Sequence, residues 1–295
     1  MAASLHQHTT YTKVLPGRLY IVATPIGNLG DITLRALDTL RQVDHVAAED
    51  TRHSRRLLQH FNITTPLIAY HDHSDDKREQ KLLAHLQDDQ SVALVSDAGT
   101  PLICDPGYTL VKQAIQRGIE VQSVPGPCAL IATLSIAGLP TERFVFEGFL
   151  PAKTTARSNY LLTLQNEPRT LVFYESSHRI LDSLRSMVQV FGHQREAVVC
   201  RELTKIYEIC LRGPLGDLLE RVSEDANQQR GEFVLVVDGY HAPKSESLTV
   251  EQQRIMKVLA EELSHKQAAS IGAQLTGVKK RTLYQWLLSA NSADR

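Results

Sequence analysis

The chain has 295 residues, of which 42% are hydrophobic and 22% charged, a composition typical of globular proteins with about two domains. Its formal net charge of −1 excludes a protein that coats nucleic acid through a general excess of cations, but leaves room for RNA binding by a local basic patch. The sequence contains neither an apolar run long enough to span a membrane nor an apolar N-terminal segment, so we expect a cytoplasmic protein.

Strand and helix patterns alternate from residue 18 to residue 140, after a polar and flexible N-terminus at 1–17. Apolar, β-branched runs predict strands at 18–24, 43–48, 91–96 and 120–124. Apolar residues at helical spacing predict a helix that begins after Asp31 as N-cap, and others at 51–61, 76–86, 108–117 and 128–137. The alternation predicts an N-terminal α/β domain, residues 18–140, whose mostly parallel sheet has helices on both faces.

A second block, residues 141–240, predicts a C-terminal α/β domain. The segment 143–149 begins this block. Its expected strands are at 170–174, 197–201, 207–212 and 232–237, and its helices at 158–164, 178–190 and 214–222. Because some strands follow one another directly, we expect a mixed sheet. A polar linker at 239–247 leads to three short helices at 249–263, 266–275 and 280–288, which predict a helix-turn-helix-like module at 248–290.

The cysteine and histidine spacings predict neither a disulfide framework nor a metal site. The four cysteines are widely spaced and form no CxxC pair, so we expect reduced thiols at Cys104, Cys128, Cys200 and Cys210. Two histidine pairs lack a cysteine or carboxylate at metal-ligand spacing, namely His6 with His8 and His71 with His73.

Three unusual loops follow predicted strands, at 25–28, 97–107 and 125–128. Ligands of parallel α/β sheets lie beyond the carboxyl ends of the strands, so these loops should converge on one cleft. The segment SDAGTPLICDPG, residues 96–107, combines glycines, prolines and two aspartates after a buried strand, which favours a ligand loop over a simple capped connection. The first loop is not GxGxxG, so the sequence does not predict a dinucleotide site.

The same segment resembles the hallmark of the ribosomal RNA small subunit methyltransferase I family, with Cys104 where serine is usual. Further stretches resemble this family: YIVATPIGNLGDITLRAL, FYESSHRI, RELTKIYEICLRG and GEFVLVVDG. The resemblance spans residues 18–288. It implies the tetrapyrrole-methylase fold, in which S-adenosylmethionine lies in the cleft between two α/β domains. It also implies 2'-O-methylation of a cytidine ribose in the decoding centre of 16S ribosomal RNA, by a homodimer.

The loops and the resemblance together predict the cofactor site. Gly99, Thr100 and Pro101 match the Gly-Asp-Pro turn of the superfamily, with threonine in place of aspartate, and Pro125-Gly126 match its Pro-Gly turn. The residues expected to bind S-adenosylmethionine are Pro25, Gly27, Asn28, Asp97, Ala98, Gly99, Thr100, Pro101, Ile103, Asp105, Pro125 and Gly126.

Three charged groups that follow predicted strand ends are candidates for catalysis. A ribose hydroxyl is a weak nucleophile, so a base or a cation that favours the alkoxide should help its methylation. The groups are Glu49, Asp50 and Arg52; Glu175, His178 and Arg179; and Arg201, Glu202 and Lys205. Each could instead be a helix cap or a surface charge, and a mechanism that depends on proximity alone stays open.

Basic residues on one helix and in the C-terminal module are candidates for RNA contact. They are Arg52, Arg55, Arg56, Lys266, Lys279, Lys280 and Arg281. Arg55 and Arg56 could alternatively form a solvated face. The module could dock on the rest of the chain or on a dimer partner through Leu275, Leu283, Trp286 and Leu287.

Two other functions fit parts of the sequence. The fold would also suit a methyltransferase that acts on a porphyrin or corrin carbon, and the tail would suit a non-catalytic regulator that binds nucleic acid. The intact ligand loop and the tail together favour the RNA enzyme. The near-zero net charge suggests that its substrate is the assembled small ribosomal subunit rather than free RNA.

Overall fold

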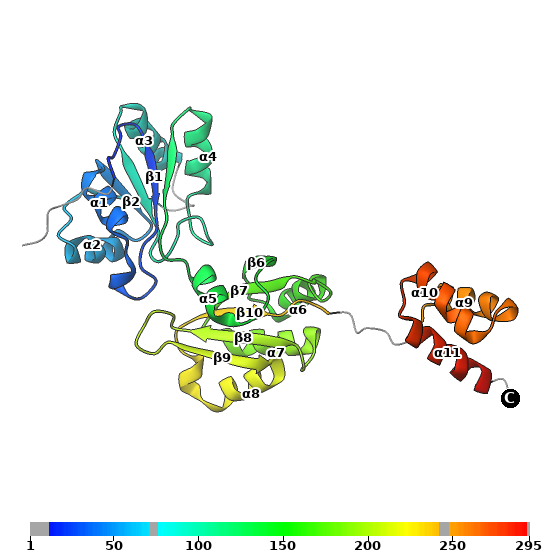
Figure 1. Ribbon diagram of the computed structural model, residues 1–295. Coiled ribbons are helices and arrows are strands. Elements are labelled where there is room, and N and C mark those ends of the chain that lie inside the picture. Colours follow the sequence, from blue (N-terminus) through cyan, green and yellow to red (C-terminus); the bar gives the residue numbers. More distant parts are fainter. Residues whose placement is uncertain (1–11, 71–75, 242–247, 294–295) are drawn as a thin grey trace, which may run out of the picture. The chain divides into compact units, whose positions relative to one another are not determined.

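The computed structural model describes residues 12–70, 76–241 and 248–293, and the chain divides into two compact units, Met1–Tyr240 and His241–Arg295. The first unit contains two five-stranded sheets and the second contains three helices (Figure 1). Within the described ranges, no helix has the length and apolar character needed to cross a membrane.

The first sheet is parallel throughout and has the order β3-β2-β4-β1-β5. Its strands are β1 Leu19–Val22, β2 His45–Ala48, β3 Leu67–Ala69, β4 Val92–Val95 and β5 Val121–Val124. Its helices are α1 Leu34–Gln42, α2 Thr51–His60, α3 Asp76–Gln87 and α4 Tyr108–Gln116, with a 3-10 turn at Leu29–Asp31. Apolar side chains of α1 and α2 pack on one face, and those of α3 and α4 pack on the other. The predicted parallel sheet with two helical layers is confirmed.

The second sheet is mixed, as predicted, and has the order β6-β7-β10-β8-β9. Only β6 and β7 pair in parallel. Its strands are β6 Phe144–Phe149, β7 Thr170–Ser176, β8 Glu196–Arg201, β9 Ile209–Pro214 and β10 Glu232–Val237. Its helices are α5 Ala129–Ala137, α6 Thr154–Thr163, α7 Ile180–Phe191 and α8 Leu215–Glu224, with a 3-10 turn at Ala226–Gln229.

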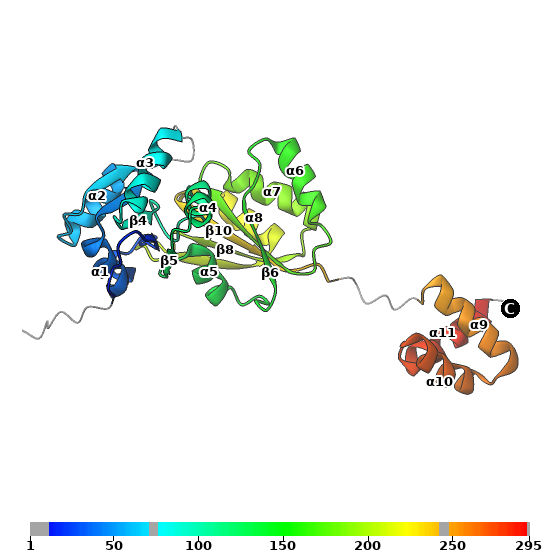
Figure 2. The same cartoon turned by 90° about the horizontal axis from the view of Figure 1, so that it is seen from above.

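The two faces of the second sheet pack against different layers. Helices α6, α7 and α8 cover one face around Phe173 and Leu235. Helix α5 covers the other face, where Leu130 and Leu134 pack against Val234 (Figures 1 and 2). Ile26, in the loop after β1, belongs to this same apolar cluster. The loops of the first sheet therefore pack directly against the second sheet.

The C-terminal unit has its own small core. Its helices are α9 Val250–Glu262, α10 His265–Thr276 and α11 Lys280–Ala293. Capping boxes begin α9 at Thr249 and α10 at Ser264. The buried residues are Leu248, Met256, Ala268, Ala269, Leu283 and Leu287, with Trp286 packed against them. Leu283 and Leu287 thus stabilise the unit itself, whereas Leu275 is 65% exposed.

Several local predictions were wrong. Helix α1 begins at Leu34 with Thr33 as N-cap, because Thr33 rather than Asp31 accepts the N–H of Ala36. Strand β3 was missed because it has only three residues. The strand expected at 207–212 begins at Ile209, and the helix expected at 158–164 begins at Thr154.

The prediction of reduced thiols was also wrong for one pair of cysteines. Cys200 on β8 faces Cys210 on β9 in the antiparallel ladder, and a disulfide joins them. Their spacing of ten residues does not reveal this cross-strand pairing. Cys104 and Cys128 are free thiols. His6, His8, His71 and His73 lie outside the described residues.

Candidate functional site

The three loops predicted to converge do meet, because β4, β1 and β5 are neighbours in the first sheet. The loop after β1 is joined to the loop after β4 by an isolated bridge. In this bridge the Thr24 N–H donates to the Gly99 carbonyl over 2.8 Å, and the Gly99 N–H donates to the Thr24 carbonyl over 3.1 Å. The Thr100 hydroxyl donates to the carbonyl of Pro127 over 3.0 Å, which ties the second loop to the third.

A cavity of about 490 Å³, here called the first cavity, lies between these loops and the second sheet. Its walls include Ile26, residues 98–100 and 103–105 from the loops, and residues 231–234 at the start of β10. Gly99 has φ +82°, and a Cβ there would lie 3.3 Å from the side chain of Ile26. Any larger residue at this position would therefore be strained and would crowd the cavity wall.

Aromatic side chains form one wall of the first cavity. The rings of Phe149 and Tyr174 lie 5.7 Å apart in an edge-on arrangement. The Tyr174 hydroxyl accepts the Leu130 N–H in the first turn of α5 over 3.1 Å, so it also fixes the start of that helix. Burial raises the pKa of Tyr174, which keeps its hydroxyl neutral.

Asp105 places a carboxyl group in the wall of the first cavity. Burial raises the pKa of Asp105 to about 6, and the nearby carboxylates of Glu49 and Asp97 add to this rise. Asp97 accepts the backbone N–H of Asp50 over 3.1 Å, which fixes it at the start of α2. Asp105 in the wall and the two carboxylates near it favour a positively charged ligand.

Glu175, also at the first cavity, is held by structural contacts. Its side chain is fully buried and accepts hydrogen bonds from the Ser183 hydroxyl at 2.6 Å and the Ser176 N–H at 2.8 Å. It also pairs with Arg179 over 2.9 Å. These partners lie at the end of β7 and on α7, so Glu175 connects the strand to the helix.

A second cavity, of about 460 Å³, adjoins the first and shares Ile26, Ala98 and Glu232 with it. His53, Arg56 and His60 line it from α2, where their spacing places them on one face of the helix. Lys205 lines it from the segment between β8 and β9. This cavity, here called the second cavity, therefore has two cations, Arg56 and Lys205, and two histidines in its wall, together with the carboxylates of Asp97 and Glu232.

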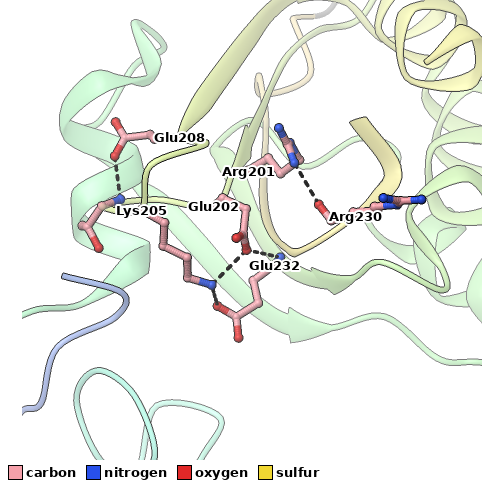
Figure 3. A network of polar contacts seen from close by, with 7 residues as sticks. Arg201, Glu202, Lys205, Glu208, Arg230 and Glu232 are labelled. Carbon is pink, nitrogen blue, oxygen red and sulfur yellow. Dashed lines mark hydrogen bonds and ion pairs between the residues drawn. The ribbon is translucent and has the colours of Figure 1, made fainter. Parts of the chain in front are cut away.

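Lys205 is the centre of a network of ion pairs (Figure 3). Its Nζ lies 2.9 Å from Glu202 Oε1 and 2.8 Å from Glu232 Oε2, and Glu202 also accepts the Glu232 N–H. Burial disfavours the charge on Lys205, but the two carboxylates outweigh burial and raise its pKa. Lys205 is therefore a fixed, protonated cation at the second cavity.

The structure brings most of the predicted cofactor residues to the two cavities. Ala98, Gly99, Thr100, Ile103 and Asp105 line the first. Pro25, Gly27 and Asp97 line the second, together with Ala98. The remaining four lie away from both walls: Asn28, Pro101, Pro125 and Gly126. Asn28 caps the following 3-10 turn instead, through the Gly30 N–H, and Gly126 packs against Ala23.

The catalytic candidates separate into those at a cavity and those that form local ion pairs. Glu175 and His178 line the first cavity, and Lys205 lines the second with Glu202 bound to it. Asp50 caps α2 and pairs with the exposed Arg52, which lowers the pKa of Asp50. The remaining three also lie outside both linings: Glu49, beside Asp105; Arg179, which pairs with Glu175; and Arg201, whose guanidinium donates to the Arg230 carbonyl.

Of the predicted RNA-contact residues on α2, only Arg56 lines a cavity. Arg52 and Arg55 are exposed on other parts of the helix surface. The C-terminal candidates are exposed on their own unit: Lys266, Lys279, Lys280 and Arg281.

Sequence reasoning missed several residues of the two cavities. Glu232 lines both, and His53 and His60 complete the basic face of α2. The i, i+3, i+7 spacing of His53, Arg56 and His60 was a signal that could have found them. Glu232 carried no such signal, because its partner Lys205 is 27 residues away in sequence.

Comparison with known proteins identifies what the chain is similar to. Residues 18–219 match the family model of Tetrapyrrole (Corrin/Porphyrin) Methylases, and residues 246–291 match that of the RsmI C-terminal HTH domain. Proteins named Ribosomal RNA small subunit methyltransferase I are 55% identical over 273 residues in Pseudomonas aeruginosa and 53% identical over 272 residues in Escherichia coli O157:H7. The alignments cover 92% of this chain and 97% and 95% of those proteins, respectively.

A solved structure has the same fold at low identity. It is uroporphyrin-III C-methyltransferase from Thermus thermophilus, complexed with S-adenosyl homocysteine. The likeness has a TM-score of 0.52 at 19% identity and covers 75% of this chain and 97% of that one. At this identity the likeness establishes the fold alone.

Proposed function

This chain belongs to the family of tetrapyrrole (corrin/porphyrin) methylases, and from that premise we propose that it is an S-adenosylmethionine-dependent methyltransferase of ribosomal RNA. One observation carries the proposal: a cofactor-sized cavity with Asp105 in its wall adjoins a cavity that Arg56, Lys205 and two histidines line, and the two share part of their walls. The relatives named for small-subunit RNA support the same substrate class.

The first cavity suits S-adenosylmethionine. Its volume of about 490 Å³ is within the usual range for small-ligand sites. Gly99, with its positive φ, lets the backbone form part of the cavity wall. The aromatic rings of Phe149 and Tyr174 form another part, which suits the flat base of the cofactor. When bound, S-adenosylmethionine supplies a methyl group on a positively charged sulfur, and the acidic wall at Asp105 favours that charge.

Lys205 and Glu232 are placed to assist the acceptor hydroxyl. Because Lys205 stays protonated, its ammonium can stabilise the oxygen anion that forms as the hydroxyl attacks. Glu232 touches both cavities, and its side chain is 75% exposed, so its carboxylate can accept the hydroxyl proton. Glu232 would take the hydroxyl proton as the acceptor oxygen gained the methyl group and the carbon–sulfur bond of the bound cofactor broke.

Within ribosomal RNA, the proposed methyl acceptor is the ribose 2'-hydroxyl of a cytidine in the decoding centre of 16S ribosomal RNA. The resemblance of the 96–107 loop to the RNA methyltransferase family supports this choice. The assembled small subunit as substrate, the homodimer and the cytoplasmic location stay predictions.

Radiolabelled methyl transfer to unmethylated small subunits, followed by mapping of the labelled nucleotide, tests the proposal. We expect label on a cytidine ribose, with less on protein-free RNA. Lys205→Met should lower kcat by about 10²–10³-fold, as loss of one group that stabilises an oxyanion does. Lys205→Arg should keep part of the activity, and the exposed Lys153→Met should keep all of it.

Absence of label in RNA would contradict the proposal, if calorimetry still shows binding of the cofactor. A porphyrin titration followed by absorbance would then test the tetrapyrrole alternative.

A further inference from the structure

The segment that joins β8 to β9 exposes two large side chains. Ile206 is 94% exposed, more than any other large hydrophobic residue that the structure describes, and Tyr207 is 72% exposed. Two adjacent exposed side chains of this size, close to the Lys205 that lines the second cavity, are candidates for contact with a ligand in that cavity. We call the residues 205–207 the hairpin tip.

The hairpin tip is held in place by its own backbone and by its neighbours. The Lys205 N–H donates to the Glu202 carbonyl over 3.0 Å, and the Glu208 N–H donates to the Lys205 carbonyl over 3.1 Å. Glu202 and Thr204 adopt positive φ values of +53° and +65°, which turn the chain sharply. The two ion pairs of Lys205 fix the start of the tip (Figure 3).

The tip also packs against the first loop of the parallel sheet. A Cβ on Gly27 would lie 2.5 Å from the Lys205 side chain and 2.9 Å from the Thr204 hydroxyl oxygen. This close approach leaves no room for a side chain at residue 27. Tyr207 is therefore an exposed residue of a well-packed segment. This segment lies beside the second cavity, which Gly27 and Lys205 both line.

The chemistry around the tip favours a nucleic acid over a protein as its partner. The second cavity presents His53, Arg56 and His60 along one face of α2, and such groups bind phosphates. Proteins commonly hold single-stranded RNA by stacking its bases on aromatic rings while cations follow the backbone. Tyr207 offers an exposed ring two residues from Lys205, which lines the second cavity.

We propose that Tyr207 stacks on a base of the single-stranded RNA acceptor and that His53, Arg56 and His60 hold its phosphates in the second cavity. The inference rests on the proposed function, since it names the part of the molecule that receives the RNA. Stacking on Tyr207 would hold the acceptor strand next to Lys205 and Glu232, where the two cavities meet.

Two measurements on the full chain test the inference. The first is fluorescence anisotropy of a labelled single-stranded RNA spanning the decoding-centre sequence, in the presence of S-adenosylhomocysteine. The second is methyl transfer to unmethylated small subunits. We expect Tyr207→Ala to weaken RNA binding and raise KM by about 5- to 150-fold, the range for loss of one base–aromatic stack. Tyr207→Phe should restore both, because it keeps the ring.

Matched controls separate the tip from the general surface. Tyr108→Ala removes another exposed tyrosine, 66% exposed and outside both cavities, and should bind RNA like the native chain. Arg56→Gln should reduce the slope of log affinity against log salt by about one, whereas Arg185→Gln on α7 should not change it. Calorimetry should show unchanged cofactor binding in every variant.

Native RNA affinity and KM in Tyr207→Ala would overturn the inference. So would a change in oligomeric state of that variant by sedimentation, which would assign the tip to a contact with a second copy. If the native chain labels no RNA, the proposed function fails. In that case, RNA binding that depends on Tyr207 in the anisotropy measurement would still support the inference. If such binding were also absent, both the proposed function and the inference would be rejected.

Discussion

At the scale of single residues, the protonation state of Asp105 should affect how tightly the first cavity binds its ligand. The pKa of Asp105 is raised to about 6, mainly by burial, above the ordinary value of 3.8. The folded chain therefore holds a proton on Asp105 between about pH 4 and pH 6, where the unfolded chain does not. Its contribution to stability accordingly falls as pH rises through this window and stays unfavourable above about pH 6.

This titration predicts a pH-dependent preference for the charged cofactor. Affinity for S-adenosylmethionine should fall roughly fivefold to tenfold from pH 7 to pH 5, because a nearby ionised carboxylate attracts the sulfonium by about 1 kcal/mol or more. S-adenosylhomocysteine lacks that charge and should change less. Calorimetry on the native chain and on Asp105→Asn checks this, and an equal pH dependence in Asp105→Asn would contradict it.

The residues of the site were only partly predictable. The 96–107 segment was identified as a ligand loop because glycines, prolines and aspartates follow a buried strand. The pairing of Lys205 with Glu232 was not, because it depends on β8 and β10 being neighbours in the second sheet. Sequence reasoning finds residues that share a loop or a helix face more readily than residues that meet across a sheet.

At the scale of elements, the junction between β7 and α7 depends on Glu175. Three groups satisfy its buried carboxylate, and two of them, Arg179 and Ser183, lie at or within the start of α7. Removal of one partner from a buried ion pair leaves the other without compensation. This arrangement accounts for the buried carboxylate of Glu175 by its contribution to stability, and it requires no role for Glu175 in methyl transfer.

We therefore predict that Glu175→Gln lowers the free energy of unfolding by about 2–3 kcal/mol while activity per folded molecule changes little. Asp182→Asn removes a carboxylate from the exposed pair with Arg185 on the same helix, and should cost less than about 0.5 kcal/mol. Urea unfolding followed by circular dichroism compares the two. Native stability combined with lost activity in Glu175→Gln would instead support a catalytic role.

The elements themselves were predicted better than their ends. The alternation of strands and helices identified the parallel sheet, since buried parallel strands are continuous apolar runs. The start of β9 was placed too early because Tyr207 and Ile209 suit a strand by composition. The positive φ values at Glu202 and Thr204, which the sequence does not reveal at non-glycine residues, extend the turn past Tyr207.

At the scale of the whole molecule, the cations that we propose for RNA contact are divided between two units. The chain as a whole is almost neutral, with a net charge of −1. The basic face of α2 belongs to the first unit. The exposed cations Lys266, Lys279, Lys280 and Arg281 belong to the second. If both sets of cations contact phosphates as proposed, RNA affinity should depend on both units.

Replacement of the four C-terminal cations by glutamine should therefore make the salt dependence of binding to small subunits shallower. The slope of log affinity against log salt should fall by about 3, since each phosphate contact contributes about 0.7–0.9. A control variant, Arg254→Gln with Lys257→Gln, changes exposed cations on α9 of the same unit. Filter binding at several salt concentrations measures both, and an unchanged slope would indicate that the unit contacts something other than RNA phosphate.

The bridge between Thr24 and Gly99 has a consequence for the order of events in turnover. It fastens a wall of the second cavity to a wall of the first, so the two loops shift together. If filling one cavity alters the other, thermodynamic reciprocity requires the same factor in both directions: a cofactor that tightens acceptor binding tenfold is itself bound tenfold more tightly by the acceptor complex. Departure of either product would then weaken the binding of the other by the same factor, and a single hydrogen-bonded pair of residues would couple their release.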